Sequence, residues 1–177
     1  MIHNLAAELE VLANNLPTGE SSRDQLSVTA IAEKIAKSFD VRPEEVGILA
    51  VSGKWRHLYF LAPVALRHVG FVPLSSTTAL AARTAREAKA EIENKFAATR
   101  HASVFEGVKA DTLSSTAIQK ILSTPILNAG KVVGVLQISR KAPTPAEAGP
   151  DFTSEDLRRA SAICRPLGKI VAHLAKE

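Results

Sequence analysis

The stretch NKFAATRHASVFEGVK, residues 94–109, gathers side chains that suit the binding of a small molecule. Arg100 and His101 stand close to Phe105, which combines a cation, a titratable ring and an apolar wall. Such a mixture suits a small anionic or aromatic ligand, and loops often carry binding residues. We therefore predict that Arg100, His101 and Phe105 contact a ligand. The alternative is a solvated loop in which Phe105 fills a gap in the core.

Two further candidates lie on expected regular elements. In the run WRHLYFLA, residues 55–62, His57 and Tyr59 share one face at the two-residue spacing of a strand and could line a pocket. The alternative for Tyr59 is an ordinary half-buried core position. Arg83 and Arg86 lie on an expected helix and could meet an anion, although for Arg83 a surface ion pair with Glu87, four residues along, is the alternative.

A third group of candidates lies in AEIENKFA, residues 90–97, where apolar and polar residues alternate as in a strand. Ile92, Asn94 and Phe96 point to the same side in this pattern. An amide on an apolar face needs a hydrogen-bonding partner. We therefore add Asn94 and Phe96 to the predicted ligand contacts.

No arrangement of residues predicts a catalytic centre, and neither a cofactor nor a metal is expected. The sequence has no Gly-x-Ser-x-Gly elbow, no phosphate-binding loop, no Gly-x-Gly-x-x-Gly and no His-x-x-x-His pair. Its five histidines are scattered. The single cysteine, Cys164, lacks the partners for a disulfide or a cysteine zinc site, and we interpret it as a small core residue. We expect that the protein is not an enzyme.

Length and composition favour one domain, because 177 residues with 46% hydrophobic side chains can build a single core. The net charge is +4, but no run of Lys and Arg is longer than two, so nucleic acid is not expected as a partner. No apolar run approaches the roughly 18 residues of a membrane span, so no membrane partner is expected. A lone cysteine fits a reducing compartment, and we predict a cytoplasmic location.

Hydrophobic periodicity predicts the elements that must position these residues. Helical spacing of apolar residues occurs in residues 2–16, 23–39, 75–89 and 154–175. Thr153 is expected to cap the last helix. Two hairpins are predicted: EVGILAVSG with WRHLYFLA, and IQKILSTPIL with KVVGVLQIS across Asn-Ala-Gly. Since residues 132–138 are almost entirely apolar, we expect a sheet that is covered on both faces.

The first and last expected helices each carry an apolar stripe that could bind a second copy of the chain. The residues of the two stripes are Leu5, Leu9, Leu12, Leu157, Cys164, Leu167, Val171 and Leu174. Alternatively, each stripe packs only against the sheet of its own chain. Because both terminal helices carry a stripe, we predict a homodimer that forms through these residues.

Three segments resemble the GAF domain family. The segments ILSTPILNAGKVVGVLQISRK and FTSEDLRRASAI are similar to the family's apolar strand, glycine turn, second strand and final helix. The segment GFVPLSSTTALAARTAREAKAEIENKF is similar to the family's middle part, a Pro-Leu element followed by a helix and a strand carrying Asn. The resemblance covers roughly residues 22–175.

This resemblance implies a single α+β domain over residues 1–177, with α/β/α layers. A central antiparallel sheet of about six strands would have the terminal helices on one face. Short helices and loops would form a ligand pocket on the other face. Residues 1–21 would form an N-terminal helix and linker that could take part in dimerisation, and residues 22–177 the core and the C-terminal helix.

This sequence lacks the complete motifs with which well-known GAF relatives bind their ligands. Cyclic-nucleotide-binding relatives carry Asn-Lys, a spaced Phe, and Asp-Glu four and five residues later. Asn94 and Lys95 match, but Lys109 and Ala110 stand where Asp-Glu is required after Phe105. Bilin-binding relatives use a cysteine near the pocket, and Cys164 lies in the wrong half of the fold.

The expected function is therefore that of a small-molecule-binding sensory or regulatory module without catalytic activity, which acts on a separate partner protein. The alternative is a protein-interaction or dimerisation module whose pocket is vestigial. A third hypothesis is an enzyme like the GAF-type reductases of free methionine sulfoxide. Those enzymes use a set of cysteines, because one thiol attacks and another resolves the intermediate, and this chain has only Cys164.

Overall fold

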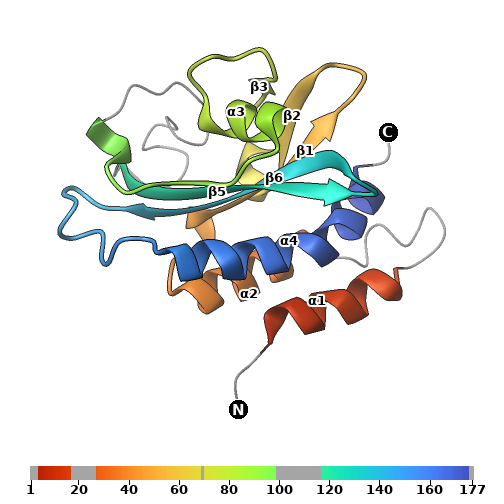
Figure 1. The fold of residues 1–177 in the computed structure, drawn as a ribbon, viewed down its shortest axis with the longest axis horizontal. Coiled ribbons are helices and arrows are strands. Elements are labelled where there is room, and N and C mark those ends of the chain that lie inside the picture. Colours follow the sequence, from red (N-terminus) through yellow and green to blue (C-terminus); the bar gives the residue numbers. More distant parts are fainter. Residues whose placement is uncertain (1–3, 17–26, 69, 99–116, 176–177) are drawn as a thin grey trace.

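A computed structural model describes residues 4–16, 27–68, 70–98 and 117–175 (Figure 1). Its longer helices and strands are α1 (Leu5–Asn14), α2 (Val28–Phe39), β1 (Val46–Ser52), β2 (His57–Ala62), β3 (Val72–Pro73), α3 (Leu80–Glu87), β4 (Glu91–Glu93), β5 (Ile118–Asn128), β6 (Lys131–Lys141) and α4 (Ser154–Leu174). Short 3-10 turns cover Pro43–Glu45, Val64–Leu66 and Phe96–Ala98. The predicted ligand contacts Arg100, His101 and Phe105 lie outside the described residues.

The six described strands form one antiparallel sheet in the order β3-β2-β1-β6-β5-β4, which confirms the α+β class and the strand number. Both predicted hairpins are present, as β1 pairs with β2 and β5 with β6. The β5–β6 turn places Ala129 and Gly130 at positive φ, 52° and 79°. A glycine is suited to this position because it adopts left-handed angles without steric cost.

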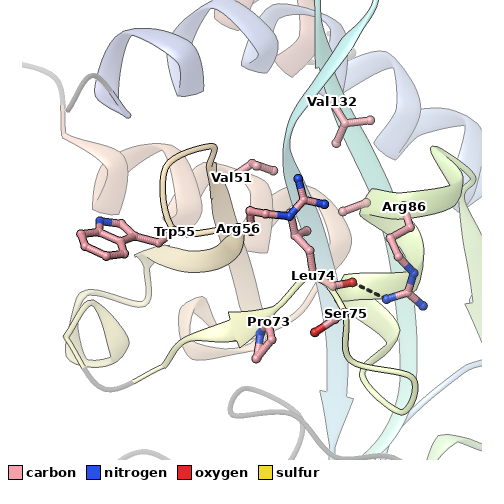
Figure 2. Close-up of a pocket in the computed structure, with 9 residues that line it drawn as sticks. Val51, Trp55, Arg56, Pro73, Leu74, Ser75, Arg86 and Val132 are labelled. Atoms are coloured by element: carbon pink, nitrogen blue, oxygen red, sulfur yellow. Dashed lines mark hydrogen bonds between the residues drawn. The ribbon is translucent and has the colours of Figure 1, made fainter.

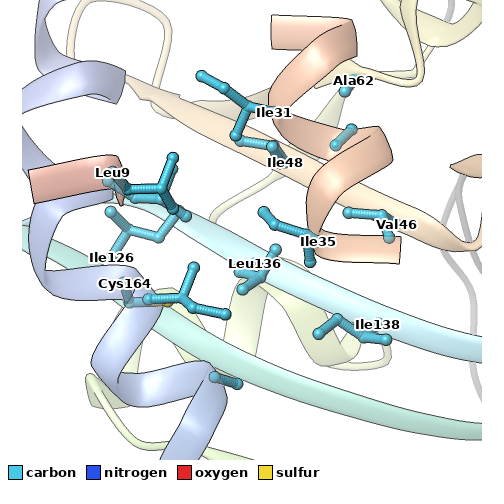
Figure 3. Close-up of a cluster of buried hydrophobic side chains, with 14 of the residues drawn as sticks. Leu9, Ile31, Ile35, Val46, Ile48, Ala62, Ile126, Leu136, Ile138 and Cys164 are labelled. Atoms are coloured by element: carbon cyan, nitrogen blue, oxygen red, sulfur yellow. The ribbon is translucent and has the colours of Figure 1, made fainter. Parts of the chain in front are cut away.

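One face of the sheet is covered by the helices α1, α2 and α4, which lie together below the strands in Figure 1. Aliphatic side chains from β1, β5 and β6 meet those of the helices in a continuous core (Figure 3). Ile35 of α2 and Leu136 of β6 are fully buried in it. Burial of this kind is the main force that stabilises such a layered fold. We call this side the helical face.

The opposite side carries α3, and we call it the α3 face. A second core joins Leu49, Phe60, Ile121 and Val135 of the strands to the small side chains of α3. Polar groups are also buried here: the hydroxyls of Thr84 on α3 and Ser123 on β5 lie 2.7 Å apart, both fully buried. This hydrogen bond holds α3 directly against the sheet, because a buried hydroxyl without a partner would be costly.

The stripes predicted for dimerisation belong to the core of a single chain. Leu5, Leu9, Cys164, Leu167 and Val171 are each at most 4% exposed without any second copy. The three remaining stripe residues, Leu12, Leu157 and Leu174, are half-buried against the same core. Their assignment as dimer contacts is therefore wrong for the buried members, because their own sheet and neighbouring helices already cover them. A homodimer as such stays a prediction.

Two predicted elements are shorter in the structure. The strand expected over residues 90–97 ends at Glu93, and Phe96–Ala98 form a 3-10 turn instead. The second helix begins at Val28 rather than near residue 23, and the side chain of Ser27 caps it by accepting a hydrogen bond from the Ala30 amide at 3.1 Å. Thr153 caps α4 as predicted, accepting from the Asp156 amide at 3.2 Å.

Candidate functional site

A hollow of about 600 Å³ opens on the α3 face, between α3, the β1–β2 turn and the start of β6 (Figure 2). Its lining consists of Val51, Trp55, Arg56, Pro73, Leu74, Ser75, Ala85, Arg86 and Val132. We call it the α3 hollow. Its volume lies in the range of about 300–1,000 Å³ that is typical of small-ligand sites. Its position between sheet and short helix is the one that the sequence analysis expected for a pocket.

The floor of the α3 hollow is apolar. Val51 is the penultimate residue of β1 and Val132 the second residue of β6, so the two side chains come from neighbouring strands. Leu74 and Ala85 add to the floor from the segment after β3 and from α3. All four side chains belong to or pack against the α3-face core. A ligand in this hollow would therefore rest an apolar surface on them.

The β1–β2 turn holds Arg56 at the edge of the hollow. Arg56 has a positive φ of 52°, and the Ser52 hydroxyl accepts a hydrogen bond from the Trp55 amide at 3.2 Å within the same turn. The Arg56 carbonyl also accepts from the Leu74 amide at 3.1 Å, which ties the turn to the segment after β3. These bonds position the guanidinium-bearing residue relative to the apolar floor.

The second cation, Arg86, enters from α3. Its Nη1 donates to the carbonyl oxygens of Leu74 and Ser76, at 2.5 and 2.6 Å. Arg86 therefore links α3 to the segment that forms one wall. Among the residues that the structure describes, no Asp or Glu forms an ion pair with Arg56 or Arg86. The lining residues that the structure describes include two guanidinium groups and no carboxylate, so the hollow favours an anionic group.

The other predicted contacts are scattered. Tyr59 is half-buried against the helical-face core and lies outside the α3 hollow, whereas Leu58 and Phe60 face α3. Tyr59 and His57 together line a different hollow, at the β2–β3 edge of the sheet, and the contact of Tyr59 with a ligand stays a prediction. Phe96 is a buried member of the α3-face core, 3% exposed.

Arg83 and Asn94 already have partners within the chain. The guanidinium of Arg83 donates to both carboxylate oxygens of Glu91, at 3.0 and 2.9 Å, so its partner is on β4 rather than Glu87. The Asn94 side chain bonds the backbone of Phe152 twice: its amide donates to the carbonyl at 3.0 Å, and its oxygen accepts from the N–H at 2.9 Å. Asn94 thus anchors the segment that precedes α4. Its predicted need for a partner is met, though not by a ligand.

Cys164 lies in α4 and is buried against the sheet. Burial raises the pKa of its thiol to about 12, and a hydrogen bond with Thr124 acts in the opposite direction. A thiol reacts as a nucleophile through its thiolate form. Cys164 is therefore suited to packing and unsuited to nucleophilic chemistry near neutral pH.

A buried carboxylate, Glu45, organises the far end of the α3 face. It accepts hydrogen bonds from the Arg42 amide at 2.9 Å and from the Lys141 amide at 2.6 Å. The hydrogen bond to Glu45 also raises the pKa of Arg42, and burial lowers the pKa of Lys141. These contacts fasten the start of β1 to the end of β6, and we assign Glu45 a structural role.

Sequence reasoning considered Arg86 as a residue that could meet an anion without adding it to the predicted ligand contacts, and it missed Arg56, Trp55 and the segment 73–75. Two signals in the sequence point toward them. No Asp or Glu occurs between Glu45 and Glu87, so every charged residue in that stretch is basic. The only Trp of the chain stands in the β1–β2 turn, where exposure is expected.

An antiparallel sheet with helices on both faces and a hollow beside a short helix defines a class of ligand-binding domain. The family model of the GAF domain matches residues 27–171, and the chain belongs to this family. No curated protein matches the sequence.

Solved structures of similar fold include proteins with different roles. The GAF domain of a phosphoenolpyruvate-protein phosphotransferase from Coxiella burnetii has a TM-score of 0.69 at 10% identity, over 96% of this chain and 91% of that chain. The GAF domain of the Acinetobacter phosphoenolpyruvate-protein phosphotransferase has a TM-score of 0.64 at 18% identity, with the same coverage. Free methionine-R-sulfoxide reductase from Neisseria meningitidis has a TM-score of 0.59 at 14% identity, over 96% and 87% of the two chains. At such identities the likeness shows the fold alone.

Proposed function

We propose that this GAF domain is a cytoplasmic sensory or regulatory module that binds a small anionic molecule in the α3 hollow, has no catalytic activity and acts on a separate partner protein. One observation carries the proposal: Arg56 and Arg86 stand over an apolar floor in a hollow whose described lining residues include no carboxylate. The matching ligand has an anionic group and a flat or aliphatic part. The family of the chain supports a ligand-binding module in general.

A ligand that binds Arg86 would change how this residue holds the segment after β3 against α3. It holds the segment after β3 through the Leu74 and Ser76 carbonyls. An anion bound to the guanidinium competes with these carbonyls, because ionised acceptors form stronger hydrogen bonds than neutral ones. The ligand would thereby favour a conformation in which α3 and residues 73–76 are released from one another, and a partner protein could sense that shift.

The absence of catalytic activity is supported by the state of the single cysteine. A reductase of the methionine sulfoxide type requires one thiol to attack and another to resolve the intermediate. Cys164 is the only cysteine in the sequence, and its thiol is buried with a raised pKa of about 12.

The proposal is tested by a thermal-shift screen of small carboxylates, phosphates and sulfonates, followed by calorimetry on the hits. A ligand present at about 100 times its Kd should add roughly 2.7 kcal/mol to the free energy of unfolding. Arg56→Ala and Arg86→Ala should each abolish the shift. Arg158→Ala is the matched control, since this exposed arginine pairs with Glu155 on α4, outside the α3 hollow.

Two results would contradict this assignment. Hits that persist in both arginine variants but disappear in Arg100→Ala or His101→Ala would move the site to the originally predicted stretch. A screen without any hit, on protein shown to be folded by circular dichroism, would remove the small-molecule function.

A further inference from the structure

A second surface lies at the β2–β3 edge of the sheet and is built from aromatic and basic side chains. Its hollow of about 510 Å³ is lined by Trp55, His57, Tyr59, Arg67, His68 and Phe71. We call it the aromatic surface. It contains the only Trp and the only Tyr of the chain. Trp55 is 64% exposed and Phe71 50% exposed, so large apolar rings face solvent here instead of filling a core.

The rings of the aromatic surface lie close to one another. The His57 ring lies 4.9 Å from Phe71, with an angle of 56° between the planes, and 6.4 Å from Tyr59 in an edge-to-face arrangement. Lys54 lies 4.9 Å from the centre of the Trp55 ring. The rings of Tyr59, His57 and Phe71 therefore form one cluster, and Trp55 lines the same hollow with Lys54 beside its ring.

The charge around the aromatic surface has a single sign. Lys54, Arg56 and Arg67 are exposed, and no acidic residue occurs in the sequence between Glu45 and Glu87. Within the described ranges, none of these three cations forms an ion pair with a carboxylate. Surfaces that bind single-stranded nucleic acid combine the same two features, aromatic rings on which bases stack and cations that meet the phosphates.

We propose that the aromatic surface binds single-stranded nucleic acid. Bases stack on Trp55 and Phe71, and Lys54 and Arg67 contact the phosphates. An acidic protein segment would also match the charge, but it has no flat rings to place on two half-exposed aromatic side chains. A free nucleotide fits less well, because small-molecule sites bury most of their ligand and this surface is open.

Nucleic acid was not expected as a partner because the basic residues are dispersed along the sequence, but the fold brings some of them together. The sequence contains no run of Lys and Arg longer than two. The cations and rings of the aromatic surface come from two separate segments, residues 54–59 and 67–71. The pairing of β2 with β3 brings these segments together, with His57 opposite Pro73 and Leu58 opposite Val72.

The test uses the full chain and a fluorescein-labelled (dT)15 oligonucleotide, with anisotropy measured at several salt concentrations. With two phosphate contacts, the logarithm of the binding constant should fall with the logarithm of salt at a slope of about −1.4. Unlabelled (dT)15 should quench the fluorescence of Trp55, the only tryptophan of the chain, and Phe71→Ala, which lies outside the α3 hollow, should reduce this quenching. Duplex DNA of equal length should bind more weakly and quench less.

Two substitutions avoid the α3 hollow, so a failure here leaves the proposed function intact. Phe71→Ala should weaken (dT)15 binding by about 5-fold to 100-fold, the usual cost of losing one stacked base. Arg67→Ala should weaken binding and reduce the salt slope by about 0.7. The matched controls are Val11→Ala, at a 63% exposed position on α1, and Arg158→Ala, and both should bind as the wild type does.

Several outcomes would overturn the proposal. These are no binding, binding that does not quench Trp55, or equal binding of duplex and single strand. Competition by poly-glutamate of equal length at the same concentration as unlabelled (dT)15 would assign the surface to an acidic protein segment. Sedimentation showing a dimer that Phe71→Ala dissociates would assign it to a second copy of the chain.

Discussion

Single side chains in this protein acquire their roles from what surrounds them. Asn94 was predicted as a ligand contact because an amide on an apolar face needs a partner, and the need was inferred correctly. The partner is the backbone of Phe152, which lies 58 residues away in the sequence. Cys164 was interpreted as a core residue, and its burial confirms this.

At the residue scale we expect the thiol of Cys164 to be unreactive in the folded protein. Its pKa rises from 9.0 to about 12, so the thiolate fraction at pH 8 falls by roughly a thousandfold. Ellman's reagent should therefore label the native protein very slowly, and should label one thiol per chain at once in guanidinium chloride. Fast labelling of the native protein would contradict the buried placement and reopen the question of thiol chemistry.

At the scale of elements, the close approach of α4 to the β5–β6 hairpin sets the geometry of the helical face. Gly168 lies in α4 where a Cβ atom would stand 2.0 Å from the carbonyl oxygen of Leu127 and 2.9 Å from its carbon. Both atoms are backbone atoms, so they cannot move aside as a flexible side chain could. The helix lies on the hairpin at this point because the residue has no side chain.

This contact predicts that replacing Gly168 by alanine lowers the free energy of unfolding instead of raising it. Gly→Ala within a helix ordinarily stabilises by about 0.5–1 kcal/mol, because alanine has the better helix propensity. Gly168→Ala should instead destabilise the protein by about 1–3 kcal/mol, the usual cost of overpacking. Urea unfolding measures the difference. Gly53→Ala is the control, since a Cβ there meets nothing within 4 Å, and a stabilised Gly168→Ala protein would refute the contact.

The whole molecule is a sheet between two unequal layers. In the part of the chain that the structure describes, α1, α2 and α4 cover one face with a large aliphatic core, and the short helix α3 covers part of the other. None of the described helices is both long and apolar enough to cross a membrane. The larger core includes both terminal helices, since α1 and α4 contribute buried residues to it. The terminal stripes therefore hold one chain together.

Leu167 tests this arrangement at the scale of the molecule. It is 1% exposed, and its truncation leaves a cavity in the helical-face core. Leu167→Ala should cost about 2–5 kcal/mol in the free energy of unfolding, while the oligomeric state measured by light scattering should stay the same. Val11→Ala, on an exposed position of α1, should change neither quantity. Loss of a dimer without loss of stability in Leu167→Ala would restore the stripe as an interface.

Much of the fold was predictable because its signals are local. The Asn-Ala-Gly turn, the Thr153 cap and the two hairpins depend on residues within a few positions of one another, and the structure confirms them. The candidate site was not predictable in the same way. The α3 hollow joins Arg56, Leu74, Arg86 and Val132, which no periodicity connects. Alternation indicated that His57 and Tyr59 share one face of their strand, but it could not indicate which side of the sheet that face is on.

The amino-acid sequence by itself determined the order of the elements, the need for cover on both sides of the sheet and the absence of a second thiol. These properties follow from composition and from neighbours along the chain. Only the tertiary structure decided which cations share a hollow, which rings face solvent and that the terminal stripes are internal. Those properties depend on strand pairing and helix packing, which bring residues together across distances that the sequence pattern does not encode.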